Sequence, residues 1–214
     1  MLVFLSMTNE MTVKNPDRFK TAKKVFRDRG GVLKTGDALS AGIHPRTLYE
    51  MERSGILEKL ARGLYRLANM PPLGNPDLVS VALKVPNSVI CLISALAYHE
   101  ITTQIPHEVY LALNRGAEPP RLEHPPIRVF WFTGEAFTQG IENYKLDGVQ
   151  VRIYSPGKTI ADCFKYRNKI GLDTAIEALK LYRERKRFKV DDLIRFAQVC
   201  RVEKVMRPYL EVLL

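Results

Sequence analysis

The sequence predicts an α+β protein of two domains. Two short helical patterns and a tight hairpin turn lie within residues 31–67, and a segment rich in proline, glycine and asparagine follows at 69–76. Beyond it, short β-type runs mix with helical patterns, and the last patterns are helical only. We therefore expect a loose segment 1–15, a first domain 16–68, a linker 69–76, and a mixed α+β domain 77–214 with a small sheet and a helical C-terminal tail.

An opening helix is predicted over residues 17–29, with Asp17 as its cap and Gly30 and Gly31 ending it. Its apolar face consists of four residues at helical spacing, Phe19, Ala22, Val25 and Phe26. A short strand over 32–34 follows. Thr35 is then expected to cap a second helix over 36–41.

A third helix begins where His44 can act as the N-cap and Pro45 fills the first helical position, at which a missing N–H costs nothing. The helix is expected to run to about Ser54. Strands over 56–60 and 64–67 then flank a tight turn at 61–63, where Gly63 can adopt a positive φ. Helix, turn, helix and hairpin in this order are typical of a winged helix-turn-helix, which lays one helix in the major groove of DNA.

The charge of the chain is basic and unevenly spread. It carries 33 Lys and Arg against 23 Asp and Glu, a formal net charge of +10. Residues 14–66 hold a net of +7 and residues 180–189 a net of +5, so the remainder is slightly acidic. This balance favours a polyanionic partner, with double-stranded DNA first and an anionic membrane surface second.

The residues predicted to contact DNA form three groups. Those expected on the third helix, at base edges or beside them, are His44, Arg46, Thr47, Tyr49, Glu50 and Arg53. Those expected on phosphates or in the minor groove are Lys34, Thr35, Lys59, Arg62 and Arg66. A basic helix over 172–189 is a second candidate DNA surface, the alternative being a solvated face; its residues are Arg183, Arg185, Lys186 and Arg187.

The second domain is expected to contain helices over 77–85, 94–100, 156–167, 172–186, 190–200 and 202–213. Its β-type runs lie at 88–92, 108–113 and 127–132. A hairpin of 144–146 and 149–154 is expected around Asp147 and Gly148. Strands and helices together predict a small sheet covered by helices.

The sequence contains no established catalytic or metal-binding pattern. The three cysteines form no CxxC pair and the four histidines have no metal-like spacing, so we expect no zinc, disulfide, cofactor or catalytic residue. Pro-Gly-Lys-Thr at 156–159 is similar to the end of a phosphate-binding loop, but Arg152 stands where that loop needs glycine. Lys158 remains a candidate anion ligand at a helix N-terminus. We find no leader and no membrane-spanning run, which favours a cytoplasmic protein.

With these residues assigned, the chain resembles the AbiEi antitoxins of type IV toxin–antitoxin systems. The resemblance runs from about Phe19 to Leu181. In the first domain it rests on residues 42–49 (GIHPRTLY), 54–57 and 62–66. In the second it rests on residues 93–99, 166–171 and 175–179, and above all on 154–164 (YSPGKTIADCF). The family usually has an acidic residue where Gly157 stands.

The resemblance implies a two-part regulator. Its first domain would bind inverted repeats in the promoter of its own operon and repress it, which is compatible with a homodimer on DNA. Its second domain would supply antitoxin activity against a nucleotidyltransferase toxin encoded alongside, without a stable complex being required. The motif residues implied for the second domain are Ser155, Pro156, Lys158, Thr159, Asp162, Tyr166 and Arg167.

Two alternatives stay open on the sequence. A winged-helix regulator whose second domain senses a small ligand would need a deep apolar pocket with a few convergent polar groups. A DNA-targeted nuclease or nucleotidyltransferase would need carboxylates gathered around a metal-sized space. The sequence leaves open whether the candidate carboxylates meet; they are Asp147, Asp162, Glu177 and Asp191.

Overall fold

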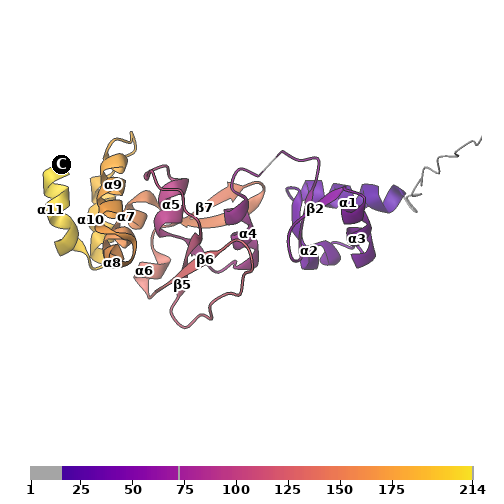
Figure 1. The fold of residues 1–214 in the computed structure, drawn as a ribbon, viewed down its shortest axis with the longest axis horizontal. Helices are drawn as coiled ribbons and strands as arrows, with labels where there is room; N and C mark the ends of the chain where they lie inside the picture. The colour runs from indigo at the N-terminus through magenta and orange to yellow at the C-terminus, as the bar shows by residue number, and fades with distance from the viewer. Residues whose placement is uncertain (1–15, 72, 214) are drawn as a thin grey trace, which may run out of the picture. The chain divides into compact units, whose positions relative to one another are not determined.

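The structure of the chain is a computed structural model, and it describes residues 16–71 and 73–213 (Figure 1). The expected loose segment 1–15 lies outside the described residues. The chain divides into two compact units, residues 1–71 and 72–214, and both are mixtures of helices and small sheets. The boundary between the units falls within the segment 69–76.

The first unit packs three helices against a three-stranded sheet. Its elements are α1 (Pro16–Asp28), β1 (Val32–Lys34), α2 (Thr35–Ser40), α3 (Pro45–Arg53), β2 (Leu57–Ala61) and β3 (Leu64–Leu67). The strands pair antiparallel in the order β1-β3-β2. Phe26, Leu48 and Met51 are buried between the helices and the sheet, as the apolar spacing predicts.

Two predicted helix caps of the first unit are wrong. Thr35 is the first residue of α2 rather than its cap, because its backbone N–H donates to the Gly63 carbonyl at 2.9 Å and continues the pairing of β1 with the hairpin. Asp17 lies within the first turn of α1, where its charge still favours the positive end of the helix dipole.

Two glycines of the first unit have conformations that other residues rarely adopt. Gly63 has φ +73° at the turn between β2 and β3, where a register shift between Lys59 and Ala61 bends the hairpin. Gly31 has φ +83°, and a Cβ atom there would lie 1.8 Å from the Met70 Sδ. Met70 therefore packs onto the backbone of Gly31 and joins the end of the unit to its core.

The second unit is built on a mixed five-stranded sheet of order β6-β5-β4-β8-β7. The strands are β4 (Val89–Ile90), β5 (Val109–Asn114), β6 (Ile127–Phe132), β7 (Ile141–Leu146) and β8 (Val149–Tyr154). β4 pairs parallel with β8, with Ile90 opposite Ile153, and β5 pairs parallel with β6. The β7–β8 hairpin and the β4–β5 pair are antiparallel.

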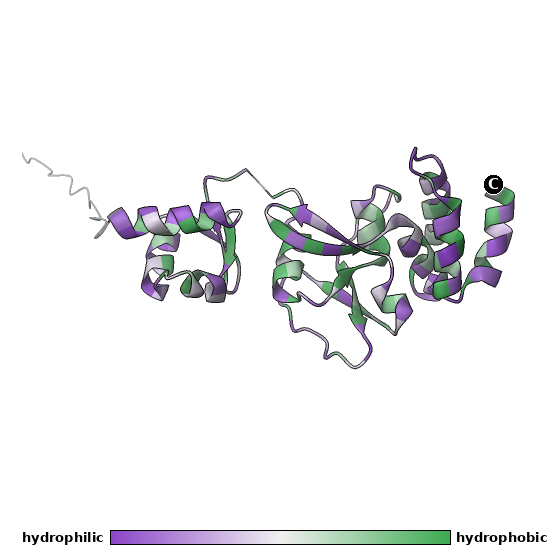
Figure 2. Cartoon of the chain, turned by 180° about the vertical axis from the view of Figure 1, so that it is seen from behind, coloured by the Kyte–Doolittle hydropathy of each residue, from purple (hydrophilic) through white to green (hydrophobic). Residues whose placement is uncertain are grey.

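Side chains alternate between the two faces of this sheet, and each face has its own core. Ile90, Leu111 and Ile153 pack with α4 (Pro76–Lys84). Val89, Ala112 and Tyr154 belong to the larger core under the C-terminal helices, and α5 (Leu92–Tyr98) contributes to both cores. Figure 2 shows hydrophobic and hydrophilic residues alternating along the helices that cover the sheet.

The helical part of the second unit surrounds one buried helix. Its elements are α6 (Glu135–Thr138), α7 (Pro156–Lys165), α8 (Arg167–Ile170), α9 (Leu172–Arg183), α10 (Val190–Val199) and α11 (Glu203–Leu213). Every residue of α7 from Gly157 to Phe164 is buried, because α5, α9 and α10 pack around it. Within residues 16–71 and 73–213, no helix is long and apolar enough to cross a membrane.

Two helix predictions in the second unit need correction, and one short helix was not predicted. α9 ends at Arg183, so Arg185, Lys186 and Arg187 lie in the loop before α10 and not on a helix. Six basic residues within 180–189 repel one another, which explains why the helix does not continue through them. The helix predicted over 156–167 breaks at Tyr166 into α7 and α8, and the short α6 was not predicted.

Candidate nucleic-acid interface

Helix α3 presents a polar face to solvent. The His44 Nδ1 accepts a hydrogen bond from the Arg46 backbone N–H at 3.2 Å, which confirms His44 as the cap. Leu48 and Met51 are buried against the other helices. Arg46, Tyr49 and Arg53 are exposed, and Tyr49 retains 57% of its surface. The helix therefore offers two guanidinium groups and a phenol to a partner.

Glu50 lies on the same helix and is already engaged. Its carboxylate accepts hydrogen bonds from Arg46 at 2.9 Å and from Arg18 of α1. The two guanidinium groups offset the carboxylate charge and hold Arg46 along the helix. Glu50 is thus a residue that orients Arg46 rather than a free acceptor for a base.

Thr47 does not belong to the exposed face. Its side chain retains only 4% of its surface, so the predicted DNA contact through Thr47 is wrong. Thr47 lies one turn before Met51, and residues four apart share a face of a helix. The Thr47 side chain is therefore directed into the core.

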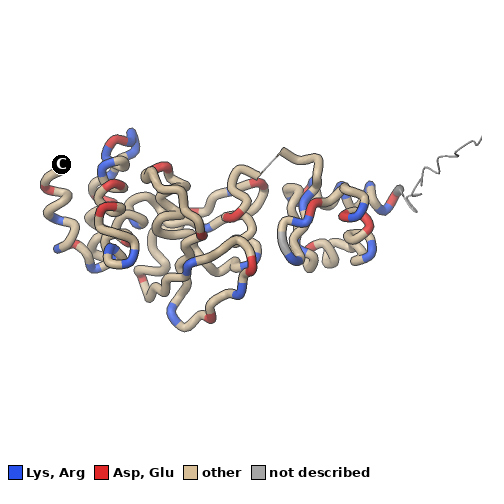
Figure 3. The backbone as a smooth tube through the Cα atoms, in the orientation of Figure 1, with Lys and Arg blue, Asp and Glu red and all other residues tan. Residues whose placement is uncertain are grey.

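The turn of the β2–β3 hairpin carries exposed cations. Arg62 in the turn and Lys59 before it are both exposed. Lys34 and Thr35 are partly exposed at the junction of β1 and α2, and the Thr35 N–H bond to Gly63 places this junction beside the turn. Lysines and arginines recur along the tube of the first unit (Figure 3).

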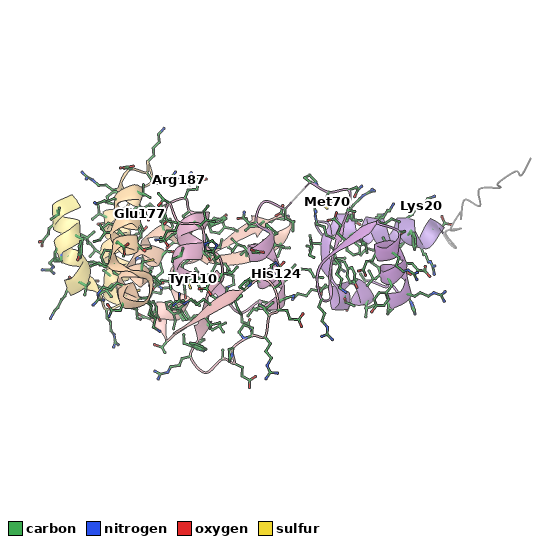
Figure 4. The ribbon with its side chains drawn as sticks, viewed as in Figure 1. Lys20, Met70, Tyr110, His124, Glu177 and Arg187 are labelled. Carbon is green, nitrogen blue, oxygen red and sulfur yellow. The ribbon has the colours of Figure 1, made fainter. Side chains whose placement is uncertain are left out.

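Arg66, in contrast, is a structural residue, and its predicted contact with DNA phosphate is wrong. It is 6% exposed and lies in the middle strand of the sheet. Its guanidinium donates to the Glu58 carboxylate at 3.2 Å, to the Met70 carbonyl at 2.7 Å and to the Pro71 carbonyl. Arg66 therefore fastens the end of the first unit to the hairpin (Met70 is labelled in Figure 4).

The hairpin also contacts α3 through Tyr65. Burial raises the pKa of Tyr65 above its ordinary value, and the nearby Glu52 carboxylate and Tyr49 add to this. Tyr65 consequently keeps its proton at neutral pH. The contact fixes the hairpin relative to the helix that carries Arg46 and Arg53.

The second basic cluster lies around the loop that joins α9 to α10. Arg183, Arg185, Lys186 and Arg187 are all exposed, and Figure 3 shows Lys and Arg gathered on this loop. Arg185 donates to the Glu100 carbonyl and lies 3.5 Å from its carboxylate. This contact anchors the loop to the end of α5 and leaves the neighbouring cations without such a contact.

The motif at the start of α7 lies mostly in the core. Lys158, Thr159 and Asp162 are fully buried. The Lys158 Nζ lies 2.5 Å from Asp162 Oδ2 and 4.0 Å from the centre of the Tyr154 ring. Cys200 Sγ donates to Asp162 Oδ1 at 3.1 Å. The Lys158 ammonium is therefore unavailable to a bound anion, contrary to the expectation from the helix start.

Burial raises the pKa of Asp162, while Lys158 and Cys200 oppose the rise by stabilising the carboxylate. Tyr166 and Arg167, the last motif residues, are half-buried and donate to the carbonyls of Trp131 and Phe164 at 3.1 and 3.0 Å. The motif thus joins α7 to the rest of the second unit.

The comparisons with known proteins can now be set beside this geometry. Residues 20–68 match a family model described as "Transcriptional regulator, AbiEi antitoxin". Over these residues the first unit is similar to the AbiEi regulators. The fold of the chain is similar to that in the crystal structure of the RV2827C protein from Mycobacterium tuberculosis, with a TM-score of 0.55, 15% identity, and coverage of 83% of this chain and 69% of that one. No curated protein matches the chain.

The matched segment contains α3 and the whole β2–β3 hairpin, since both lie within residues 20–68. The recognition made from the sequence is therefore confirmed for the unit that carries the exposed Arg46, Tyr49, Arg53 and Arg62. The second unit lies outside the family match.

The four candidate carboxylates of the second unit lie on different elements, and Asp147 is in the turn between β7 and β8. Asp162 is buried with Lys158, and Asp191 is exposed in the first turn of α10. Glu177 accepts from the hydroxyls of Thr102 and Thr103 at 3.0 and 2.5 Å, which lowers its pKa. In the described residues, no group of three or more His, Cys, Asp or Glu side chains is placed to hold a metal ion.

Sequence reasoning missed a cleft of about 560 Å³ in the second unit. Its wall includes His99, Ser155, Gly157, Tyr182 and the loop cations. The sequence singled out the start of α7 and the basic run separately. It contains no signal that the two meet, because only the packing of α9 and α10 around α7 brings them together.

Proposed function

We propose that this protein is a DNA-binding repressor of its own operon and the antitoxin for a nucleotidyltransferase encoded beside it. The observation that carries the proposal is the exposed face of α3, with Arg46, Tyr49 and Arg53, in a unit similar to the AbiEi regulators. The chain-wide charge of +10 supplies the long-range attraction to DNA.

In this proposal the first unit acts as a winged helix-turn-helix. Helix α3 lies in the major groove, where Arg46 and Arg53 donate to guanine edges and Tyr49 contacts bases or sugars. The hairpin is the wing, and Lys59 and Arg62 meet phosphates or the adjacent minor groove. A bidentate contact from arginine to guanine contributes roughly 1–3 kcal/mol of discrimination against other bases.

Fluorescence anisotropy with the DNA upstream of the protein's own reading frame tests the DNA assignment. Arg46→Ala and Arg53→Ala should each reduce the preference for this DNA over a scrambled duplex by about tenfold. Arg121→Ala is the matched control, because it removes the same charge from an exposed site in the second unit. Equal preference in all three variants would overturn the assignment of the α3 face.

The second unit would supply the antitoxin activity. We infer this from the resemblance of residues 154–164 to the AbiEi motif, and a stable complex with the toxin is not required by it. Co-expression of the chain, or of the chain with α3 variants, with the neighbouring nucleotidyltransferase reading frame tests the inference. Rescue of growth by variants that no longer bind DNA would separate antitoxin activity from repression.

Binding to inverted repeats predicts two protein copies for each operator. Sedimentation of the complex with a duplex containing one or two repeats measures this stoichiometry. A single copy on the two-repeat duplex at saturation would contradict the proposal of a homodimer on DNA.

A further inference from the structure

The cleft in the second unit brings together cations from one segment and a helix start from another. Lys186, Arg187 and Lys189 line it from the loop between α9 and α10, and Arg187 is labelled in Figure 4. Ser155 and Gly157 line it from the start of α7. Its volume of about 560 Å³ lies within the range of sites for small organic ligands.

The cleft wall keeps a net positive charge after its ion pairs are taken into account. Glu142 accepts a hydrogen bond from the Tyr144 hydroxyl, and Asp192 pairs with Arg195 at 3.2 Å. Arg185 is held by Glu100. Among the residues that the structure describes, no ion pair involves Lys186, Arg187 or Lys189. The Tyr144 hydroxyl is neutral, so Glu142 keeps its negative charge, and these three cations face this space against one carboxylate.

The start of α7 adds hydrogen-bond donors to the same wall. Ser155 is the N-cap residue, yet its hydroxyl makes no cap hydrogen bond and is buried with no partner in the described structure. A buried hydroxyl without a protein partner is uncommon, and this one is free to donate to a ligand. Pro156 has no N–H and the Thr159 N–H donates to the Ser155 carbonyl, so the first-turn backbone donors without a carbonyl partner within the helix are those of Gly157 and Lys158.

Another part of the wall is aromatic. The rings of His99 and Tyr144 both line the cleft, and their centroids are 5.9 Å apart. The His99 Nε2 lies 2.7 Å from the Tyr154 carbonyl oxygen, which can only accept a hydrogen bond, so the neutral ring carries its proton on Nε2. Nδ1 is then a hydrogen-bond acceptor. A ligand with a phosphate at one end and a polar ring at the other fits this distribution.

We propose that this cleft binds a small phosphorylated ligand of nucleotide size, with its phosphate held by Lys186, Arg187 and the start of α7. The proposal is independent of DNA binding by the first unit. The joint placement of loop cations, the α7 start and aromatic rings around one space of about 560 Å³ favours a small molecule over the DNA backbone, which offers phosphates but no ring to such a cleft. The loop cations would then serve a ligand site rather than the second DNA surface predicted from the sequence.

Calorimetric titration of the full chain with ATP and, separately, with tripolyphosphate tests the site without metal ions. Saturable binding of one equivalent of either probe with a dissociation constant below about 1 mM supports the proposal. Tighter binding of ATP than of tripolyphosphate would indicate a further contact to the ring of the nucleotide. Absence of saturable binding by both probes up to this concentration would overturn it.

Matched double variants locate the binding. Lys186→Ala with Arg187→Ala should reduce the affinity for the probe at least tenfold, and Ser155→Ala should reduce it several-fold. Lys180→Ala with Arg183→Ala removes the same charge from exposed positions of α9 that do not line the cleft, and should leave the affinity within twofold. Equal losses in the two double variants would overturn the proposal in favour of general electrostatic attraction.

Thermal unfolding of each variant shows that the fold is retained, as expected for exposed loop residues. The same variants are measured on DNA. If the Lys186 and Arg187 double variant lost affinity for DNA while keeping its affinity for the probe, the loop would be a DNA contact and the ligand site would be wrong.

Discussion

The Arg46 Nε donates a hydrogen bond of 2.9 Å to Oε1 of Glu50, one turn further along α3. The Arg46 side chain is 78% exposed, so Glu50 fixes the direction of a guanidinium that solvent surrounds. Arg18 approaches the same carboxylate from α1. A carboxylate held between two arginines selects one orientation of Arg46. It also places a negative charge next to the surface that we propose binds DNA.

Glu50→Ala should therefore raise affinity for random DNA and lower the preference for the operator. The repulsion removed is about 1 kcal/mol for charges about 4 Å apart in water, or roughly fivefold in affinity. Loss of orientation at Arg46 lowers the preference. Anisotropy with operator and scrambled duplexes measures both effects, with Glu123→Ala in the second unit as the control. An operator preference unchanged from the native protein would contradict the orienting role.

Arg62 and Arg66 lie four residues apart and should respond in opposite ways to substitution. Arg62→Ala should weaken binding to all DNA and reduce the slope of log affinity against log salt by about 1, with no change in stability. Arg66→Ala should destabilise the first unit by roughly 1–3 kcal/mol, because the Glu58 carboxylate and two carbonyls lose their donor. Salt-dependent anisotropy and hydrogen exchange of the first unit separate the two results.

Removing one partner of the buried Lys158–Asp162 pair should lower the stability of the second unit much more than replacing both partners by apolar residues. Lys158→Met leaves an uncompensated carboxyl in the core and should destabilise the second unit by roughly 3–5 kcal/mol. Lys158→Met with Asp162→Leu should recover most of that loss, because no buried group is then left without a partner. Trp131 is the only tryptophan and lies in the second unit, so its fluorescence follows the urea unfolding of that unit. Equal losses in the single and double variants would show that packing, not pairing, holds Lys158.

Acid should weaken the second unit through His99. Burial lowers its pKa below the ordinary 6.5, opposed by its bond to the Tyr154 carbonyl and by Glu142. Below pH 6.5 the unfolded chain takes up the proton before the folded one, so stability falls as the pH drops from 6.5 toward the folded pKa.

The loss from His99 grows as the pH falls through this window, because protonation competes with burial of the ring. His99→Gln keeps a donor for the Tyr154 carbonyl but does not titrate, so its stability should depend less on pH over this window. Urea unfolding of both proteins at several pH values gives the difference. Parallel curves would assign the acid sensitivity to other groups, such as Asp162.

The elements of the first unit could be predicted because their signals are local. His44 and Pro45 mark the start of α3, and Gly63 marks the turn, within a few residues of the structure they determine. The burial of Thr47 was also within reach, since it shares a helix face with Met51. The structural role of Arg66 could not be predicted, because two of its partners are carbonyls beyond the end of β3 that only the folded chain brings back to it.

The second unit shows where local reasoning fails. The spacing of Lys158 and Asp162 on one helix face was visible in the sequence, but their complete burial depends on α5, α9 and α10. The end of α9 at Arg183 has no glycine or proline to mark it. The cations that follow were predicted to continue the helix, although their mutual repulsion disfavours it. The cleft depends on three distant segments meeting, which no local pattern encodes.

The pairing of Ile90 with Ile153 also determines an order of folding during synthesis. The strands of the first sheet end at Leu67 and the contacts of Arg66 end at Pro71, so the first unit can fold while the ribosome is still translating the second. The middle of the second sheet must wait until β8 has emerged, and pairing over such a separation is slow. A nascent chain would thus carry a folded first unit while the second unit is still unfolded. A ribosome that stalled between the two would release a fragment that contains the first unit alone.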